Sequence, residues 1–263
     1  MSTLQQYIKD LAYSIAPQPI ERASIESFLS VVEEKLLNSF ENELEQCISI
    51  GAYARETAIR YTIDKESDFD LLLLFKNEND LEGFNLKKEA IIKFISKNYT
   101  QSEEVTKDLK VQMKFGKVDL IPAVVSFQND IPKLFIANKN KSSWVQKNPL
   151  TFDEFINKKN EESSFTLKPI IRLLKYWNIS HGRYFTTESL EEFAANRISS
   201  VHSLQAEIVH ILEQVPVLLK ENIKSIRVLQ ELQELTPQLK QVVYKNDEYK
   251  SLFIFKQLFP PVY

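Results

Sequence analysis

Residues 67–75 of this 263-residue chain read Ser-Asp-Phe-Asp-Leu-Leu-Leu-Leu-Phe. The run from Phe69 to Phe75 is too short for a typical helix and too apolar for a surface strand, so it predicts a central, buried β-strand. Asp68 and Asp70 stand two positions apart where this strand begins, and the alternation of side chains along a strand places both carboxylates on one face. Two like charges beside an apolar core repel each other and lose hydration. A divalent cation offsets them most directly.

A third carboxylate, Asp119, lies in the later apolar run from Val118 to Val125. The dipeptide Gly116-Lys117 separates this run from the preceding one, Val111 to Phe115, and predicts a type II′ hairpin turn that returns Asp119 to the same sheet. Three carboxylates on two adjacent strands can hold two Mg²⁺ ions roughly 3.5 to 4 Å apart, the spacing of two-metal phosphoryl transfer, and Mn²⁺ is an expected substitute. A solvated turn is the ordinary explanation of an isolated Asp-x-Asp, and the third strand aspartate favours the metal site.

A single glycine precedes the aspartates, in the segment Gly51-Ala-Tyr-Ala-Arg-Glu-Thr-Ala-Ile59. Glycine lets the backbone approach a phosphate closely, and a helix that begins just after the turn directs its unpaired N–H groups at the same anion. Taken alone, Gly51 is a strand-to-helix turn. Together with the Asp-x-Asp pair and the later strand aspartate, it forms an ordered three-part signal that is more specific than any of its parts.

Composition narrows the class of protein. The four glycines, at positions 51, 83, 116 and 182, are too far apart for a Walker A loop or a dinucleotide-binding GxGxxG motif. The single cysteine excludes a disulfide framework and favours a reducing, cytoplasmic setting. A net charge of −3 argues against extended nucleic-acid binding. Apolar runs are far shorter than the roughly 18 to 20 residues of a membrane span, so we expect a soluble protein with no membrane partner.

The two halves of the chain differ in their patterns. Apolar residues at three- to four-residue spacing predict a long helix from about Ser24 to Gln46, and a second helix covers Leu86 to Tyr99. From about residue 150 onward strand signals almost vanish and helical patterns recur. We therefore expect an α+β fold, in which a catalytic lobe of residues 1–150, with a mixed sheet and helices, packs on a helical lobe of residues 151–263. A cleft is expected between the two lobes.

Two windows of this acidic chain contain no Asp or Glu. The first, between Asp130 and Asp153, holds Lys133, Lys139, Lys141 and Lys147, and the second, from Ser163 to Thr187, holds Lys168, Arg172, Lys175 and Arg183. In a helix that begins near Pro169, the spacing 168, 172, 175 puts three cations on about one face. A solvated basic face is the ordinary explanation, and the absence of interleaved acids favours a lining for triphosphates.

These segments resemble the DNA polymerase β-type nucleotidyltransferase superfamily, whose pattern is Gly-Ser, a spacer, Asp-x-Asp and a third Asp on a later strand. More narrowly, they resemble the cGAS/DncV-like nucleotidyltransferases of bacterial anti-phage systems. The likeness spans about residues 24 to 195. Its blocks are residues 51–59, 67–71 and 118–123, Trp144 followed by Asn148-Pro149, and residues 168–178.

The resemblance implies a polymerase β-type core that makes a cyclic di- or oligonucleotide second messenger from nucleoside triphosphates, with two Mg²⁺ ions. It implies that Asp68 and Asp70 bridge both ions, while Asp119 completes the acceptor-side metal and helps deprotonate the attacking hydroxyl. The nucleotide-binding candidates are Gly51, Ala52, Arg55, Thr57, Lys168, Arg172 and Lys175, and Lys175 is the best candidate for the donor phosphates. Regulatory protein partners are also expected, and the oligomeric state is left open.

One position departs from the family pattern. Ala52 stands where the family usually has a serine that hydrogen-bonds the triphosphate, and losing one charge-assisted hydrogen bond costs on the order of 1.5 to 3 kcal/mol. All three metal ligands are present, so catalysis is favoured. Two alternatives are nucleotidyl transfer to tRNA or protein, which the acidic pI disfavours for tRNA, and a non-catalytic nucleotide-binding module, which Ala52 favours.

Overall fold

The computed structural model describes residues 3–76, 83–129, 131–199, 203–216 and 226–262. The chain forms two compact units. The sheet unit consists of residues Gln18–Glu56 and Asp64–Glu154, and the helical unit consists of Met1–Pro17, Thr57–Ile63 and Phe155–Tyr263. The chain therefore passes between the units several times, first after residue 17 and again on either side of residues 57–63. The predicted division into lobes of residues 1–150 and 151–263 stays a prediction.

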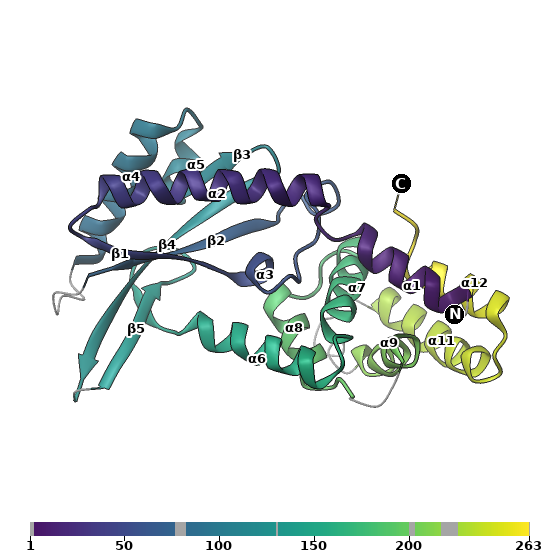
Figure 1. The fold of residues 1–263 in the computed structure, drawn as a ribbon. Helices are drawn as coiled ribbons and strands as arrows, with labels where there is room; N and C mark the ends of the chain where they lie inside the picture. The colour runs from purple at the N-terminus through teal and green to yellow at the C-terminus, as the bar shows by residue number, and fades with distance from the viewer. Residues whose placement is uncertain (1–2, 77–82, 130, 200–202, 217–225, 263) are drawn as a thin grey trace. The chain divides into compact units, whose positions relative to one another are not determined.

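The sheet unit is built on a six-stranded mixed sheet (Figure 1). Its strands are β1 (Leu44–Ile50), β2 (Asp68–Phe75), β3 (Lys110–Met113), β4 (Gly116–Gln128), β5 (Ile131–Ala137) and β6 (Trp144–Gln146). The strand order is β1-β2-β4-β5-β6, with β3 paired to β4 off this path. β2 and β4 run parallel and the other pairs are antiparallel. The predicted mixed sheet is confirmed, and β2 is an inner strand, as its apolar run indicated.

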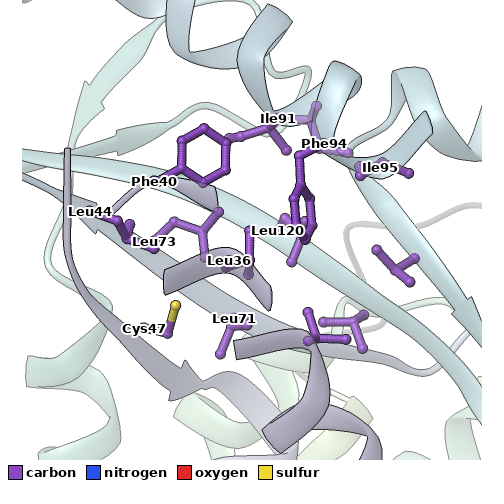
Figure 2. Packing of buried hydrophobic residues seen from close by; sticks show 14 of the residues in the cluster. Leu36, Phe40, Leu44, Cys47, Leu71, Leu73, Ile91, Phe94, Ile95 and Leu120 are labelled. Carbon is purple, nitrogen blue, oxygen red and sulfur yellow. The ribbon is translucent and has the colours of Figure 1, made fainter. Parts of the chain in front are cut away.

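Two long helices, α2 (Pro19–Ser39) and α4 (Phe84–Asn98), lie along one face of the sheet, and the short helices α3 (Gly51–Ala54) and α5 (Glu103–Lys107) complete the unit. Leu71 and Leu73 of β2 pack into this face with Leu36 of α2 and Phe94 of α4 (Figure 2). The alternate residue Leu72 belongs to a second buried cluster, with Ile50, Ala123 and Ile136. Because both faces of β2 are buried, an almost continuous apolar run suits it.

The long N-terminal helix is present, but the predicted limits Ser24 and Gln46 were wrong. α2 begins at Pro19, where Gln18 and Glu21 form a capping box, and ends at Ser39. Phe40 and Leu44 continue the helical spacing of apolar residues and are buried, yet Phe40 is the C-cap and Leu44 begins β1. Burial against the sheet, rather than continuation of the helix, accounts for these two positions.

The hairpin before Asp119 turns two residues earlier than predicted. Met113 pairs with Gly116, so Lys114-Phe115 form the connection and Gly116 is already the first residue of β4. Gly116 has φ +133°, and a Cβ there would lie 2.8 Å from the Phe69 ring and 3.0 Å from the Ser67 carbonyl oxygen. The glycine is thus required by the close approach of the start of β2, and the hairpin still delivers Asp119 beside that strand.

The described elements of the helical unit are all helices. They are α1 (Thr3–Ser14), α6 (Pro149–Glu162), which begins in the sheet unit, α7 (Leu167–Ser180), α8 (Thr187–Ala195), α9 (Leu204–Leu212), α11 (Ile226–Tyr244) and α12 (Glu248–Leu258). Ile170, Ile171, Leu174 and Trp177 of α7 are fully buried, which confirms the predicted core side of that helix. In the described parts of the chain, no helix has the length and apolar character needed to cross a membrane.

Candidate active site

Three aspartates lie on the same face of the sheet, opposite the face that packs on α2 and α4. Asp70 of β2 is in register with Asp119 of the parallel strand β4, and paired residues of neighbouring strands share a face. Asp68 lies two residues before Asp70 and therefore on that face as well. The pKa of Asp70 is raised to about 7, first by burial and then by the negative charges of Asp119 and Asp68. The structure thus brings the three predicted carboxylates within electrostatic reach of one another.

Two lysines of the sheet unit bind the outer two carboxylates. Lys110 of β3 places its Nζ 2.5 Å from Oδ2 of Asp68. Lys141, in the loop between β5 and β6, donates hydrogen bonds to Oδ1 of Asp119 and to the backbone oxygen of Asp108. Burial raises the pKa of Asp119 even though the Lys141 charge opposes that shift. Each outer carboxylate therefore has an ammonium partner, whereas Asp70 gains its cationic stabilisation from the charges of Arg55 and Lys110.

The chemistry of the donor set fits Mg²⁺, which prefers carboxylate oxygens. As the described side chains are placed, no three Asp, Glu, His or Cys residues converge to hold a metal. Asp68 is instead engaged with Lys110, and Asp119 with Lys141. Lysine ammonium groups thus stand in for the cations that a cluster of three carboxylates requires. The carboxylates suit a metal pair, and two of them are occupied by cations of the chain itself.

Gly51 packs directly against Asp70. β1 ends at Ile50, and Gly51 opens the four-residue helix α3 with φ +78°. A Cβ at position 51 would lie 2.0 Å from Oδ2 of Asp70. The predicted glycine turn is present, and two features require glycine there. The backbone is in the left-handed region, and the Asp70 carboxylate occupies the space that a side chain would need. Ala52 follows in α3 and is half-buried.

Arg55, the next predicted nucleotide contact, is buried in the sheet unit. Its Nη1 forms an ion pair with Oδ1 of Asp153, and its guanidinium lies 4.9 Å from the ring centroid of Phe152. The Arg55 charge also lowers the pKa of Asp70. In the sequence, Asp153 marks only the end of an acid-free window, and no local pattern indicates this pairing.

The other predicted nucleotide contacts belong to the helical unit. Lys175 of α7 is buried, and its ammonium donates to the Thr57 carbonyl oxygen (2.9 Å), to Oγ1 of Thr57 (3.2 Å) and to Oε1 of Glu191 in α8 (2.5 Å). The Thr57 hydroxyl donates to the same Glu191 oxygen. Arg172 donates from Nε to the Ala12 carbonyl oxygen at 3.1 Å. Lys168 lies near the start of α7, where its backbone N–H donates to Oδ1 of Asn160.

The predicted residues therefore form two sets. Gly51, Ala52, Arg55 and the three aspartates are in the sheet unit, whereas Thr57, Lys168, Arg172 and Lys175 are in the helical unit. The charged partners Lys110 and Glu191 were not predicted from the sequence. Lys141 was predicted only as a member of a basic window, and this window is the one sequence feature that pointed to it.

Comparison with protein families gives one match. Residues 1–160 match the family model described as "Second Messenger Oligonucleotide or Dinucleotide Synthetase domain", abbreviated SMODS. This range includes the three aspartates and the Gly51 turn, and it covers more than half of the chain. A search of curated proteins found no match.

Solved structures with the same fold share little sequence with this chain. CdnC of E. coli MS115-1, solved with ATP, has a TM-score of 0.68 and 12% identity, and the match covers 98% of each chain. The same protein was also solved in a complex with HORMA-deltaN. The CD-NTase CdnG of Bradyrhizobium diazoefficiens, in complex with GTP, has a TM-score of 0.66 and 11% identity over 97% of both chains. The CdnE cyclic dinucleotide synthase of Elizabethkingia meningoseptica, with GTP and Apcpp, has a TM-score of 0.61 and 15% identity, covering 83% of this chain and 85% of the other.

Proposed function

Because the chain belongs to the Second Messenger Oligonucleotide or Dinucleotide Synthetase family and is a nucleotidyltransferase, we propose that it joins nucleoside triphosphates into a cyclic di- or oligonucleotide second messenger. One observation carries the proposal. Asp70 and Asp119 are in register on parallel strands, Asp68 shares their face, and Gly51 packs without a side chain against Asp70. This arrangement puts a backbone turn and three carboxylates on one face of the sheet, which suits phosphoryl transfer.

The three aspartates are proposed to bind two Mg²⁺ ions, for which Mn²⁺ can substitute. When bound, the ions neutralise charge on the phosphates and stabilise the attacking and leaving oxygens. Asp119 accepts the proton of the acceptor hydroxyl or orients that hydroxyl toward the phosphate. Gly51 leaves the backbone open to the triphosphate beside Asp70, and Ala52 contributes its backbone without the hydroxyl that a serine would add.

Basic side chains are proposed to hold the triphosphate. Arg55 is held by Asp153 and carries its charge near Asp70, so it can orient a phosphate close to the carboxylates. Lys168, Arg172 and Lys175, with Thr57, are the proposed contacts from the helical unit. Lys175 has three ammonium hydrogens, and the hydrogen bonds to Thr57 and Glu191 use three acceptors. A direct contact with a donor phosphate therefore requires that Lys175 give up one of these partners.

An assay of product formation tests the proposal. The purified protein is incubated with labelled nucleoside triphosphates and Mg²⁺ or Mn²⁺, and the products are treated with phosphatase. We expect a phosphatase-resistant product from the wild type, and a loss of at least roughly a thousandfold in Asp70→Ala, because a lost metal ligand removes transition-state stabilisation. Glu103→Gln, which neutralises an exposed acid of α5, is the matched control and keeps full activity.

The same assay distinguishes the other reaction classes. Label that appears only on added tRNA or protein would contradict the cyclisation. Binding of triphosphates without turnover would contradict catalysis and indicate a nucleotide-binding module.

The cellular role proposed for the product is signalling in bacterial anti-phage defence, from the cytoplasm. The E. coli CdnC relative was solved in a complex with HORMA-deltaN, and we propose that a regulatory protein partner also acts on this chain. Plaque counts on bacteria that carry the gene with its neighbours check the role. We expect fewer plaques with the wild type than with Asp70→Ala, and equal plaque counts would contradict a defence function.

A further inference from the structure

The outer carboxylates of the candidate metal site carry cations that belong to the chain. The side chains of Lys110 and Asp68 are 24% and 23% exposed, so this pair is in contact with solvent. The side chains of Lys141 and Asp119 are 10% and 17% exposed. The Lys110–Asp68 pair is therefore half-buried, whereas in the second pair Lys141 is buried and Asp119 is half-buried.

Hydrogen bonds hold the backbone of the loop that carries Lys141. The Asn138 N–H donates to the Ser143 carbonyl oxygen at 2.9 Å, and the Lys141 N–H donates to the Asn138 carbonyl oxygen at 2.8 Å. Lys141 itself has φ +49°, an uncommon conformation for a residue other than glycine. Nζ of Lys88 donates to the Lys141 carbonyl oxygen at 2.8 Å. The backbone of this loop is therefore fixed in the form that directs the Lys141 ammonium at Asp119.

The net charge of the cluster differs between the metal-free and the metal-bound protein. Three ionised carboxylates facing two ammonium groups leave an excess of one negative charge, smaller than the excess of three that the carboxylates would have alone. Two divalent ions added to the same cluster would leave a large positive excess if both ammonium groups stayed in place. Repulsion between the metal ions and the ammonium groups then favours the departure of the lysines.

We propose that Lys110 and Lys141 are resident counter-ions of the metal site, which hold Asp68 and Asp119 in the metal-free protein and are displaced from them when metal binds. The inference rests on the metal-dependent function proposed above. It assigns the two lysines a positioning role, since they act on the carboxylates and not on the substrate. Their presence keeps the carboxylates folded together without metal and lowers the affinity of the site for metal.

A metal titration without nucleotide tests the displacement. Mn²⁺ binding to the metal-free full chain is measured by isothermal titration calorimetry for the wild type, Lys110→Met and Lys141→Met. We expect each substitution to tighten Mn²⁺ binding roughly tenfold, since the ion no longer competes with an ammonium group. The matched control is Lys114→Met in the same hairpin, because the exposed Lys114 ammonium lies over the Phe115 ring, 5.0 Å from its centroid. This control changes the net charge equally and should leave the affinity nearly unchanged.

Each alternative gives a different result. If the lysines only orient the carboxylates for metal, Lys110→Met and Lys141→Met bind Mn²⁺ more weakly than the wild type, which overturns the proposal. Equal tightening by Lys114→Met also overturns it, because general electrostatics then suffices. If the wild type and both variants bind no Mn²⁺, the proposed metal site itself fails, and the inference fails with it.

A measurement on the wild type alone covers the case in which Lys141→Met does not fold. Lysine acetylation by an acid anhydride is followed by peptide mass spectrometry with and without Mn²⁺. We expect Lys110 and Lys141 to react several-fold faster with Mn²⁺, since displaced ammonium groups lose their carboxylate partners, while Lys114 is unchanged. Unchanged or slower acetylation of Lys110 and Lys141 at saturating Mn²⁺ would overturn the displacement.

Discussion

Lysine and carboxylate groups meet in both units, but the two units place these pairs in different surroundings. In the helical unit, Lys175 and Glu191 are 6% and 0% exposed, and Thr57 supplies two further acceptors and a hydroxyl donor. In the sheet unit, Lys110, Asp68 and Asp119 remain partly exposed although Lys141 is buried, and Asp70 adds a third carboxylate beside the two pairs. The first arrangement is closed and balanced, and the second is open and has an excess of negative charge.

The difference in burial and charge gives the two kinds of ion pair different roles. A buried ion pair with all its hydrogen bonds made is strongly destabilised when one partner is removed. A cluster with more acids than bases has a raised carboxylate pKa and gains from any cation that enters. The same two residue types therefore stabilise the fold in the helical unit and prepare a cation site in the sheet unit.

The largest effect on stability is expected from Glu191→Gln. The substitution leaves the Lys175 ammonium buried without a carboxylate, which should lower the free energy of unfolding by about 3 to 5 kcal/mol. Urea unfolding followed by circular dichroism measures the change. Asp70→Asn, which removes a carboxylate from the open cluster, should have the opposite sign.

A double variant controls for the loss of packing in the buried pair. In Lys175→Met with Glu191→Leu, both charges are gone and apolar side chains fill the space, so most of the stability should return. If Lys175 contacts the donor phosphates, this stable double variant still loses nucleotide binding. A change below about 0.5 kcal/mol in Glu191→Gln would contradict the closed and balanced description of the pair.

Asp70 is expected to make the metal-free protein less stable as the pH rises. Its pKa of about 7 in the folded chain lies above its ordinary value of 3.8, so the folded chain holds a proton that the unfolded chain releases between these values. The contribution of this carboxyl to stability is therefore complete at low pH and is lost as the pH rises through about 7. In Asp70→Asn the penalty is absent, and we expect Tm to rise by roughly 5 °C at pH 8 and by less at pH 5.

Thermal unfolding in the presence of a chelator measures this difference. Asp119 has a raised pKa as well, so a smaller decline with pH should persist in the Asp70→Asn variant. Glu103→Gln serves as the control, since its exposed carboxylate has a pKa lowered by Lys107 and no share in the cluster. A Tm difference between wild type and Asp70→Asn that is the same at pH 5 and pH 8 would contradict the role of Asp70 ionisation.

Local sequence patterns predicted an element correctly where its residues are buried by the packing that the pattern implies. The run from Phe69 to Phe75 was correctly assigned as a buried inner strand because both of its faces are covered. The end of α2 was predicted wrongly because Phe40 and Leu44 obey the helical period for a different reason, which is burial beyond the helix. Periodicity in the sequence records which residues are buried, and it does not record what buries them.

The acids of the candidate site were predictable and their partners were not. Asp68, Asp70 and Asp119 stood out because charged residues at the mouth of or inside apolar strands need a compensating group. Their lysine partners are 42 and 22 positions away in the chain, and Glu191 is 16 positions from Lys175. Contacts over such separations depend on how the strands and helices pack, so the identity of the partner is a property of the fold.

The smallest effect is expected from Ala52→Ser, which restores the hydroxyl that the family pattern places beside Gly51. One added hydrogen bond to a phosphate is worth about 1.5 kcal/mol, so KM for the nucleoside triphosphate should fall roughly tenfold with little change in kcat. Ala54→Ser, at an exposed position of the same four-residue helix, is the control and should leave KM unchanged. The hydroxyl added at position 52 belongs to the sheet unit alone, so this variant tests phosphate binding in that unit independently of Lys175. An unchanged KM would show that position 52 does not face the triphosphate.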